Sequence, residues 1–319
     1  MREIFIGEAI RQKRLELGKT QEKLCEELAK ELCAGLFDPS TLSRIENGRQ
    51  TPSRSRARVL LQRLGLPHDR YYTYSSPNEA EADALWTEIE DCVSRYRRSL
   101  GEEKHQAQMD ALERLDRLEA ITEADDNITG QYILAMRVAL GSYGFEERLE
   151  MLLEAIRLTV PRFDADVLTG RLYSLDETSI INQIAEAYSE AGQHEKAAGM
   201  FSQLLAYAQE HYQNVTQPSR YLSQAACCYA RELCLTGRYK KALEIAALGR
   251  KTCLDYGYCQ SLPGLLAVMA ECQYAQGERE QSRRLYRQAY YLYKETGNAC
   301  GRTAVEEAAR KRLGPEFPL

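Results

Sequence analysis

The chain has few residues that could build a metal-ligated or disulfide framework. Its ten cysteines include no CxxC pair, and of its four histidines none lies three to five residues from another. Because zinc sites need closely spaced Cys and His ligands, we expect no metal site and no cofactor. The cysteines are expected to be reduced thiols in the core or in a groove.

Long apolar runs are also missing. No window approaches the ~20 apolar residues that a membrane helix needs, and charges interrupt the short apolar run at the start. P-loop, HExxH and GxSxG motifs do not occur either. We therefore expect a soluble cytoplasmic protein with no membrane segment and no enzymatic activity.

Charge is unevenly distributed along the chain. The length of 319 residues and the 44% hydrophobic content predict a substantial core and about two domains. The formal net charge of −5 divides into +4 for residues 1–72 and −9 for the remainder. A basic head on an acidic body is typical of a polyanion-binding module joined to a separate domain.

The segment DPSTLSRIENGRQTPS, which begins at Asp38, has the features of a short exposed helix. Asp38 is a favourable N-cap, Pro39 suits the first helical position, and Gly48 ends the helix. Leu42 and Ile45 share one side. The opposite side carries groups suited to phosphates and base edges, namely Ser40, Thr41, Ser43 and Arg44.

The head as a whole shows short amphipathic helices around one small core, with Gly18 closing the first helix and Thr20 capping the second. Here RQKRLELGKTQEKL followed by STLSRIENGRQTPS resembles the lambda-repressor-like, Xre-type helix-turn-helix family over residues 4–66. The resemblance implies an internal ion pair between Arg14 and Glu46. It also implies that Gln21 contacts the DNA backbone at a helix start and that Pro39, Ser40 and Arg44 face bases. Thr41 and Ser43 on the exposed side of the same helix, and Arg49 just beyond it, complete the candidate DNA-binding residues.

One stretch departs from that family. Between Thr20 and Gly48 the chain is about seven residues longer, through AKELCAG. These residues could extend the second helix by about 10 Å or form a longer loop before Asp38, and the sequence allows both. The alternative for the whole head is a small helical protein-interaction module with an incidental basic surface.

After a predicted linker at 67–78, the chain from 79 to 319 has an all-α pattern. Three segments share a motif: IAEAYSEAGQHEKAAGMF, YARELCLTGRYKKALEIA and MAECQYAQGEREQSRRLY. In each, small residues lie seven positions before and five positions after a turn glycine. Such residues allow two antiparallel helices to approach closely. The glycines are Gly192, Gly237 and Gly277, and the small residues are Ala185, Ala197, Ala230, Ala242, Ala270 and Ser282.

This pattern resembles the tetratricopeptide repeat, although the glycines are 45 and 40 residues apart. Further helix pairs are expected at about 79–120 and 127–159, with a capping helix near 300–313. The predicted fold is therefore an all-α protein: a helix-turn-helix domain (1–66), then a tetratricopeptide-like α-solenoid of about five helix pairs (79–319). A generic helical bundle is the alternative for the body.

The first helices of such pairs line a concave surface that commonly binds extended peptides. Asn and Gln side chains can bond both groups of a peptide backbone, whereas Glu and Arg select charge. Projecting the repeat gives the candidate peptide-binding residues Asn182, Glu186, Ser189, Gln224, Cys227, Arg231, Glu271 and Tyr274.

In architecture the chain resembles the peptide-pheromone-sensing regulators of Gram-positive bacteria, the RRNPP group. That resemblance implies a cytoplasmic homodimer that binds double-stranded DNA at a paired, palindromic operator. A short signalling peptide on the repeat domain would then change DNA binding. In the alternative function, the repeat domain is a protein-docking or dimerisation scaffold without a peptide ligand.

Overall fold

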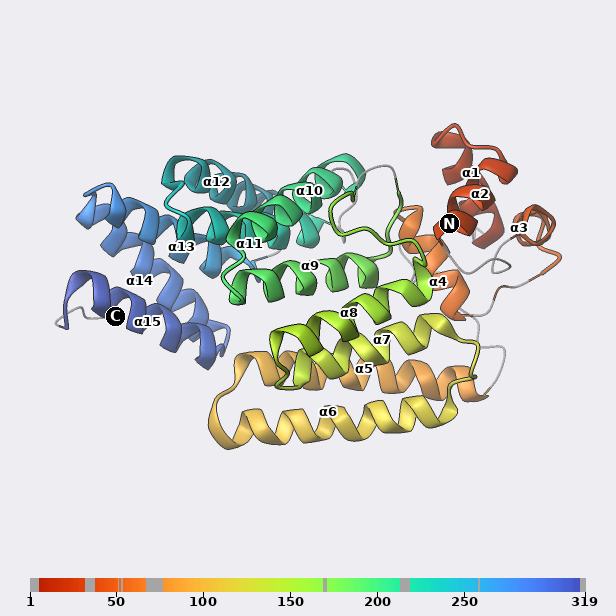
Figure 1. The fold of residues 1–319 in the computed structure, drawn as a ribbon, viewed down its shortest axis with the longest axis horizontal. Coiled ribbons are helices and arrows are strands. Elements are labelled where there is room, and N and C mark those ends of the chain that lie inside the picture. Colours follow the sequence, from red (N-terminus) through yellow and green to blue (C-terminus); the bar gives the residue numbers. More distant parts are fainter. Residues whose placement is uncertain are drawn as a thin grey trace. The chain divides into compact units, whose positions relative to one another are not determined.

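The computed structural model describes residues 6–31, 38–50, 52, 54–66, 77–168, 171–212, 219–257 and 259–315. Within these ranges the regular elements are the α-helices labelled in Figure 1, and no strand occurs, which confirms the all-α prediction. None of the described helices is both long and apolar enough to cross a membrane. The chain packs as two units, one formed by residues 1–89 and 112–184 and the other by residues 90–111 and 185–319.

The first unit begins with the head, which contains α1 (Ile6–Glu16), α2 (Gln21–Glu31), α3 (Pro39–Glu46) and α4 (Arg54–Arg63). Its helix ends follow the local chemistry of the sequence. Gly18 has a φ of 65° after α1, and the backbone N–H of Lys23 donates to the Thr20 hydroxyl at the start of α2 at 3.1 Å. The predicted closure and cap are therefore confirmed.

The apolar core of the head is continuous with the body. It contains the two α3 residues predicted to face inward, Leu42 and Ile45, which are 0% and 1% exposed. Ile128, from α7 (Asn127–Leu140), belongs to the same core. The other members are Ile6, Ile10, Leu24, Cys25, Ala57, Leu60, Leu61 and Leu64.

Gly7 permits the close packing of α1 against α3. A Cβ atom at Gly7 would lie 2.0 Å from the carbonyl oxygen of Ile45, which is backbone and has no room to move aside. The absence of a side chain at this position therefore sets how closely the two helices approach.

Two predicted segments fall largely outside the described residues. Helix α2 continues to Glu31, so the first part of the AKELCAG extension is helical, whereas residues 32–37 are not described. Of the linker predicted at 67–78, residues 67–76 are not described, and α5 begins at Pro77.

Two helix pairs follow the head, at the positions predicted for them: α5 (Pro77–Arg98) with α6 (Gly101–Ile121), and α7 with α8 (Phe145–Thr159). In the first unit, α5 and α6 run antiparallel and are joined by ion pairs between Arg114 and Glu88 (2.7 Å) and between Arg117 and Glu81 (3.3 Å). Helix α7 packs against α8.

The remaining helices continue the array, ending in the predicted last helix. They are α9 (Leu175–Glu190), α10 (His194–Tyr212), α11 (Ser219–Leu235), α12 (Tyr239–Tyr256), α13 (Leu262–Ala275), α14 (Arg279–Glu295) and α15 (Ala299–Leu313). In the second unit each helix from α10 to α15 packs against the next, and α13 also contacts α11 and α15. This is the arrangement of a helical-repeat solenoid.

The turn chemistry read from the sequence explains these pairs. The φ angles of Gly192, Gly237 and Gly277 are 74°, 76° and 88°, a left-handed conformation that favours glycine. The six small residues predicted at the helix contacts are each 0% exposed. The prediction of closely packed pairs turning at glycine is confirmed.

Candidate nucleic-acid interface and repeat-domain surface

Helix α3 begins at a cap that uses both oxygens of one carboxylate. Asp38 Oδ1 accepts hydrogen bonds from the backbone N–H groups of Ser40 (2.8 Å) and Thr41 (2.9 Å). The Ser40 hydroxyl also donates to Oδ1 at 2.5 Å, and the Thr41 hydroxyl donates to Oδ2 at 2.6 Å. The start of α3 is therefore fixed by the sequence DPST itself.

The exposed side of α3 is the side predicted to contact DNA. Ser40 and Arg44 are exposed, Ser43 is partly exposed, and Arg49 lies exposed beyond the end of the helix. The Arg44 guanidinium lies along its own helix and donates to the carbonyl and the hydroxyl of Ser40, both at 3.3 Å. These bonds are long and exposed, so the side chain can leave them at little energetic cost.

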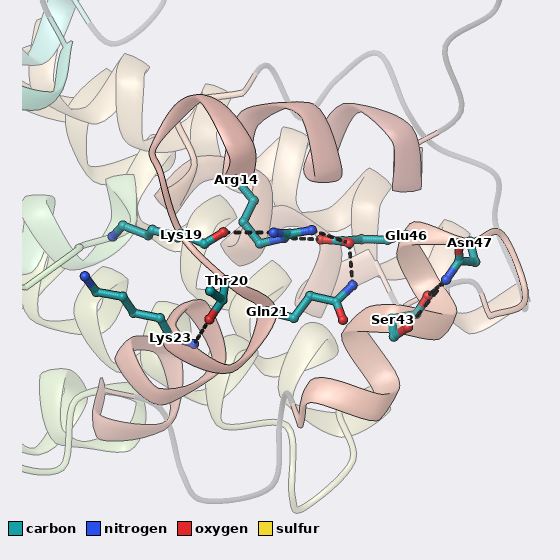
Figure 2. A network of polar contacts seen from close by, with 8 residues as sticks. All are labelled: Arg14, Lys19, Thr20, Gln21, Lys23, Ser43, Glu46 and Asn47. Atoms are coloured by element: carbon teal, nitrogen blue, oxygen red, sulfur yellow. Dashed lines mark hydrogen bonds and ion pairs between the residues drawn. The ribbon is translucent and has the colours of Figure 1, made fainter.

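A buried ion pair ties α3 to α1, as the resemblance implied. Arg14 Nε and Nη2 donate to Glu46 Oε1 and Oε2 at 2.6 Å and 2.8 Å, a bidentate geometry that Figure 2 shows. The two side chains are 8% and 1% exposed. The hydrogen bond with Glu46 raises the pKa of Arg14.

The same pair organises the turn into α2. Arg14 Nη1 donates to the carbonyl oxygen of Lys19 at 2.8 Å, and Gln21 Nε2 donates to Glu46 Oε2 at 2.6 Å (Figure 2). Glu46 therefore holds the side chain of Gln21, which is predicted to contact the DNA backbone from the start of α2. One carboxylate near the end of α3 positions the start of α2 relative to the exposed helix.

The candidate peptide-binding residues lie on α9, α11 and α13, the first helices of successive pairs. Gln224 and Arg231 are exposed, and Asn182 is 7% exposed. The remaining candidates are partly exposed: Glu186, Ser189, Cys227, Glu271 and Tyr274. Among the described residues, Asn182 has no side-chain hydrogen-bond partner.

The structure brings several of these residues together. Arg231 of α11 lies 3.6 Å from Glu186 of α9. Ser189 donates to the buried Glu232 at 2.5 Å, and Nδ1 of His194 lies 2.6 Å from the same carboxylate. Polar side chains of neighbouring first helices are thus paired across the predicted peptide-binding surface.

Cys227 is a neutral thiol rather than a nucleophile, because burial raises its pKa to about 11. The nine described cysteines form no disulfide. No group of three or more His, Cys, Asp or Glu side chains within the described ranges is placed to hold a metal ion. The buried thiols among these cysteines act as small apolar packing groups.

The helix-turn-helix family model matches residues 10–71, which include all of α2, α3 and α4. The head is a helix-turn-helix domain. A comparison with curated protein sequences finds no match.

Solved structures with the same fold align with nearly the whole chain. PlcR from Bacillus thuringiensis, crystallised with the peptide PapR7 and DNA, has 17% identity and a TM-score of 0.55, with 94% of this chain and 98% of PlcR covered. The apo form of the competence regulator ComR from Streptococcus vestibularis has 15% identity and a TM-score of 0.51, with 97% and 98% covered. The prediction of a helix-turn-helix domain followed by a helical-repeat domain is confirmed.

Sequence reasoning did not identify Arg312 of α15 as part of the repeat-domain surface. Its Nε donates to Glu271 at 2.8 Å, and its guanidinium carbon lies 5.6 Å from the centre of the Tyr274 ring. The sequence shows only a basic last turn of α15, from Arg310 to Arg312. Positive charge at this position is explained by its favourable interaction with the helix dipole. The contact with α13 depends on packing and has no local signal.

Gln183 was also missed, and it adjoins Asn182 on α9. Both polar atoms of its amide are buried, and neither has a hydrogen-bond partner among the described residues. Buried amides without partners are uncommon in folded proteins because their desolvation is not compensated. The middle of α9 therefore carries two neighbouring amides with unused hydrogen-bonding capacity.

The Asp38 cap gives a testable prediction for the helix-turn-helix domain. Its bonds to the hydroxyls of Ser40 and Thr41, and then to their N–H groups, hold the pKa of the Asp38 carboxyl well below its usual range. A depressed folded-state pKa contributes stability above the ordinary pKa of aspartate, and this is lost only as the pH falls through the folded-state value. We expect Asp38→Ala to lower the thermal unfolding midpoint at pH 7, because α3 loses its cap.

The matched control is Asp38→Asn, since asparagine is an equally good N-cap residue. Circular dichroism on the full-length protein measures both variants. If Asp38→Ala unfolds at the wild-type temperature, the cap does not hold α3.

Proposed function

We propose that the protein is a sequence-specific DNA-binding transcriptional regulator whose repeat domain binds a short signalling peptide and thereby alters DNA binding. It acts as a cytoplasmic homodimer on a palindromic operator and has no enzymatic activity. Residues 1–66 form the DNA-binding domain, and residues 79–319 form the sensor and dimerisation domain. The observation that carries the proposal is the exposed, capped helix α3 in a helix-turn-helix domain, joined in one chain to a helical-repeat domain.

The DNA-binding part rests on the geometry of α3. Helix-turn-helix domains place their second helix in the major groove, with its N-terminal residues contacting base edges. In α3, Ser40 lies in the first turn and Arg44 in the last turn, both on the exposed side, while Leu42 and Ile45 bind the helix to the core. The proposed contacts from outside α3 come from Gln21 and Arg49.

The peptide-binding part rests on the fold shared with PlcR, whose structure contains a peptide and DNA, and on the amides of α9. A peptide backbone offers N–H and C=O groups that Asn182 can satisfy at once. The charged candidates on α11 and α13, Arg231 and Glu271, would then select peptide side chains.

The DNA-binding proposal is tested by selection from a random double-stranded DNA pool with the purified full-length protein. We expect enrichment of a two-fold symmetric site whose half-sites are about 34 Å, one helical turn, apart. Measured affinity should fall steeply as salt increases, because phosphate contacts release counterions. Enrichment of no sequence over the starting pool would contradict the proposal.

The peptide-binding proposal predicts a specific effect of Asn182→Ala. The probe is a synthetic peptide enriched from a random short-peptide library on the full-length protein. We expect Asn182→Ala to weaken its binding about tenfold, since two neutral hydrogen bonds are lost. Affinity for the selected DNA in the absence of peptide should not change.

The control is Lys241→Ala, an exposed residue of α12, which should leave peptide affinity unchanged. If the library yields no peptide while the DNA site is still bound, the repeat domain is a docking or dimerisation scaffold. If Asn182→Ala and Lys241→Ala weaken peptide binding equally, Asn182 is not part of the peptide site.

A further inference from the structure

The last helix of the helix-turn-helix domain is bonded to the body through a fully buried ion pair. Arg63 Nη2, on α4, donates to Glu177 Oε1, in the first turn of α9, at 2.6 Å. Both side chains are 0% exposed. The two residues are 114 positions apart in sequence, so the pair joins the DNA-binding domain to the repeat helices within the first unit.

The carboxylate of Glu177 is held in place from several sides. The Thr159 hydroxyl donates to Oε1 at 2.6 Å, and the backbone N–H of Ser174 donates to Oε2 at 2.7 Å. Thr159 in turn accepts a bond of 2.6 Å from Gln131 Nε2 of α7. The N-terminus of α9 also favours a negative charge at this position. Glu177 is therefore a fixed acceptor, and the planar guanidinium of Arg63 must orient to it.

Further contacts extend along α4 on the same side. The Arg58 guanidinium lies 3.5 Å from the Asp176 carboxylate and 3.8 Å from the centre of the Trp86 ring of α5. Gln62 Oε1 accepts a bond of 3.3 Å from the backbone N–H of Leu175. Helix α4 is thus held to α5 and α9 over about one and a half turns, so the orientation of the domain follows these helices.

A buried ion pair of this kind contributes more to geometry than to stability. Removing two charges from water costs about as much as their attraction returns, so an apolar pair of similar size often leaves stability unchanged. An apolar pair lacks direction, however, and allows α4 to settle at several angles. The specific effect of the ion pair is therefore on the orientation of the domain.

We propose that Arg63 and Glu177 are positioning residues that fix the helix-turn-helix domain on the repeat helices, so that a dimer accepts only one spacing of DNA half-sites. This rests on the proposed function as a dimeric DNA-binding regulator. Helix α9 carries both Glu177 and Asn182, which are five residues or about 7.5 Å apart along its axis. A peptide bound at Asn182 therefore acts on the helix that orients the DNA-binding domain.

The test uses full-length protein and the DNA site that the wild type selects, with one or two base pairs inserted between the half-sites. Each inserted pair rotates one half-site relative to the other, so we expect wild-type affinity to fall at least about tenfold. In the double variant Arg63→Met/Glu177→Met we expect affinity for the uninserted and inserted sites to agree within about threefold. The matched control is Arg114→Met/Glu88→Met, an ion pair between α5 and α6 outside the helix-turn-helix domain, which should discriminate like the wild type.

Arg63→Met/Glu177→Gln is a second double variant, used where the first does not fold. It also removes both charges but keeps an acceptor oxygen for the backbone N–H of Ser174, and we expect it also to lose discrimination. A folded variant that still rejects the inserted sites would overturn the inference. So would a wild type that binds its site but tolerates insertions. A wild type that selects no DNA instead contradicts the proposed function, which separates the two failures.

Discussion

Arg44→Ala is expected to weaken binding to the selected DNA site about tenfold to a hundredfold while leaving the fold intact. A bidentate contact from arginine to a guanine edge is worth about 1–3 kcal/mol, and alanine makes no such contact. Arg44 is exposed, and its bonds reach only Ser40 on its own helix, so nothing in the core depends on it. Fluorescence anisotropy with labelled DNA measures the loss, and circular dichroism measures the fold.

Removal of any positive charge weakens DNA binding to some degree, so the control must remove one charge elsewhere in the helix-turn-helix domain. Arg11→Ala does this from an exposed position on α1. We expect only a small loss that is the same for selected and random DNA. If Arg11→Ala weakens binding to the selected DNA as much as Arg44→Ala does, the basic charge of the domain, rather than α3, determines affinity.

Arg14→Met is expected to destabilise the helix-turn-helix domain by about 3–5 kcal/mol, the largest effect on stability that we predict. The substitution leaves the carboxylate of Glu46 buried without its counter-ion, and breaking one side of such a pair costs this much. Gln21 Nε2 would be the only side-chain donor left to that carboxylate among the hydrogen bonds described above. The free energy of unfolding is measured by urea denaturation, followed through the helical signal.

The double variant Arg14→Met/Glu46→Met distinguishes the cost of an unpaired buried charge from the loss of the contacts that position α2. With both charges gone, no unpaired buried charge is left, so we expect most of the lost stability to return. DNA affinity should not return, because Gln21 and the turn at Lys19 lose the groups that position them. A single variant as stable as the wild type would show that Arg14 and Glu46 are not paired in solution.

The parts of the fold that could be predicted from the sequence are those specified by neighbouring residues. The cap at Asp38, the inward side of α3 and the glycine turns of the repeats each depend on residues within about two helical turns. The residue types at these positions were therefore sufficient to predict the cap, the buried side of α3 and the turns. The Arg14–Glu46 pair spans 32 positions and was anticipated only through the family resemblance.

The contacts that could not be predicted join distant segments. Nothing in the sequence near Arg63 distinguishes it from Arg58 or Arg56, yet Arg63 is fully buried against a residue 114 positions away. Ile128 reads as an ordinary helix residue, although it completes the core of the DNA-binding domain. Arg312 likewise reads as a surface charge, although it contacts Glu271. Such pairings are set by how helices pack, which helical periodicity alone does not encode.

The burial of Arg63 limits how this architecture can be recombined. A chimaera that places residues 1–66 on another repeat domain would bring Arg63 against a surface without Glu177, leaving a guanidinium in the interior with no counter-ion. It would also remove Ile128 from the core that it completes. An exchange of DNA-binding specificity between regulators of this architecture therefore has to transfer α7 and the start of α9 together with the first four helices, or replace only the exposed residues of α3.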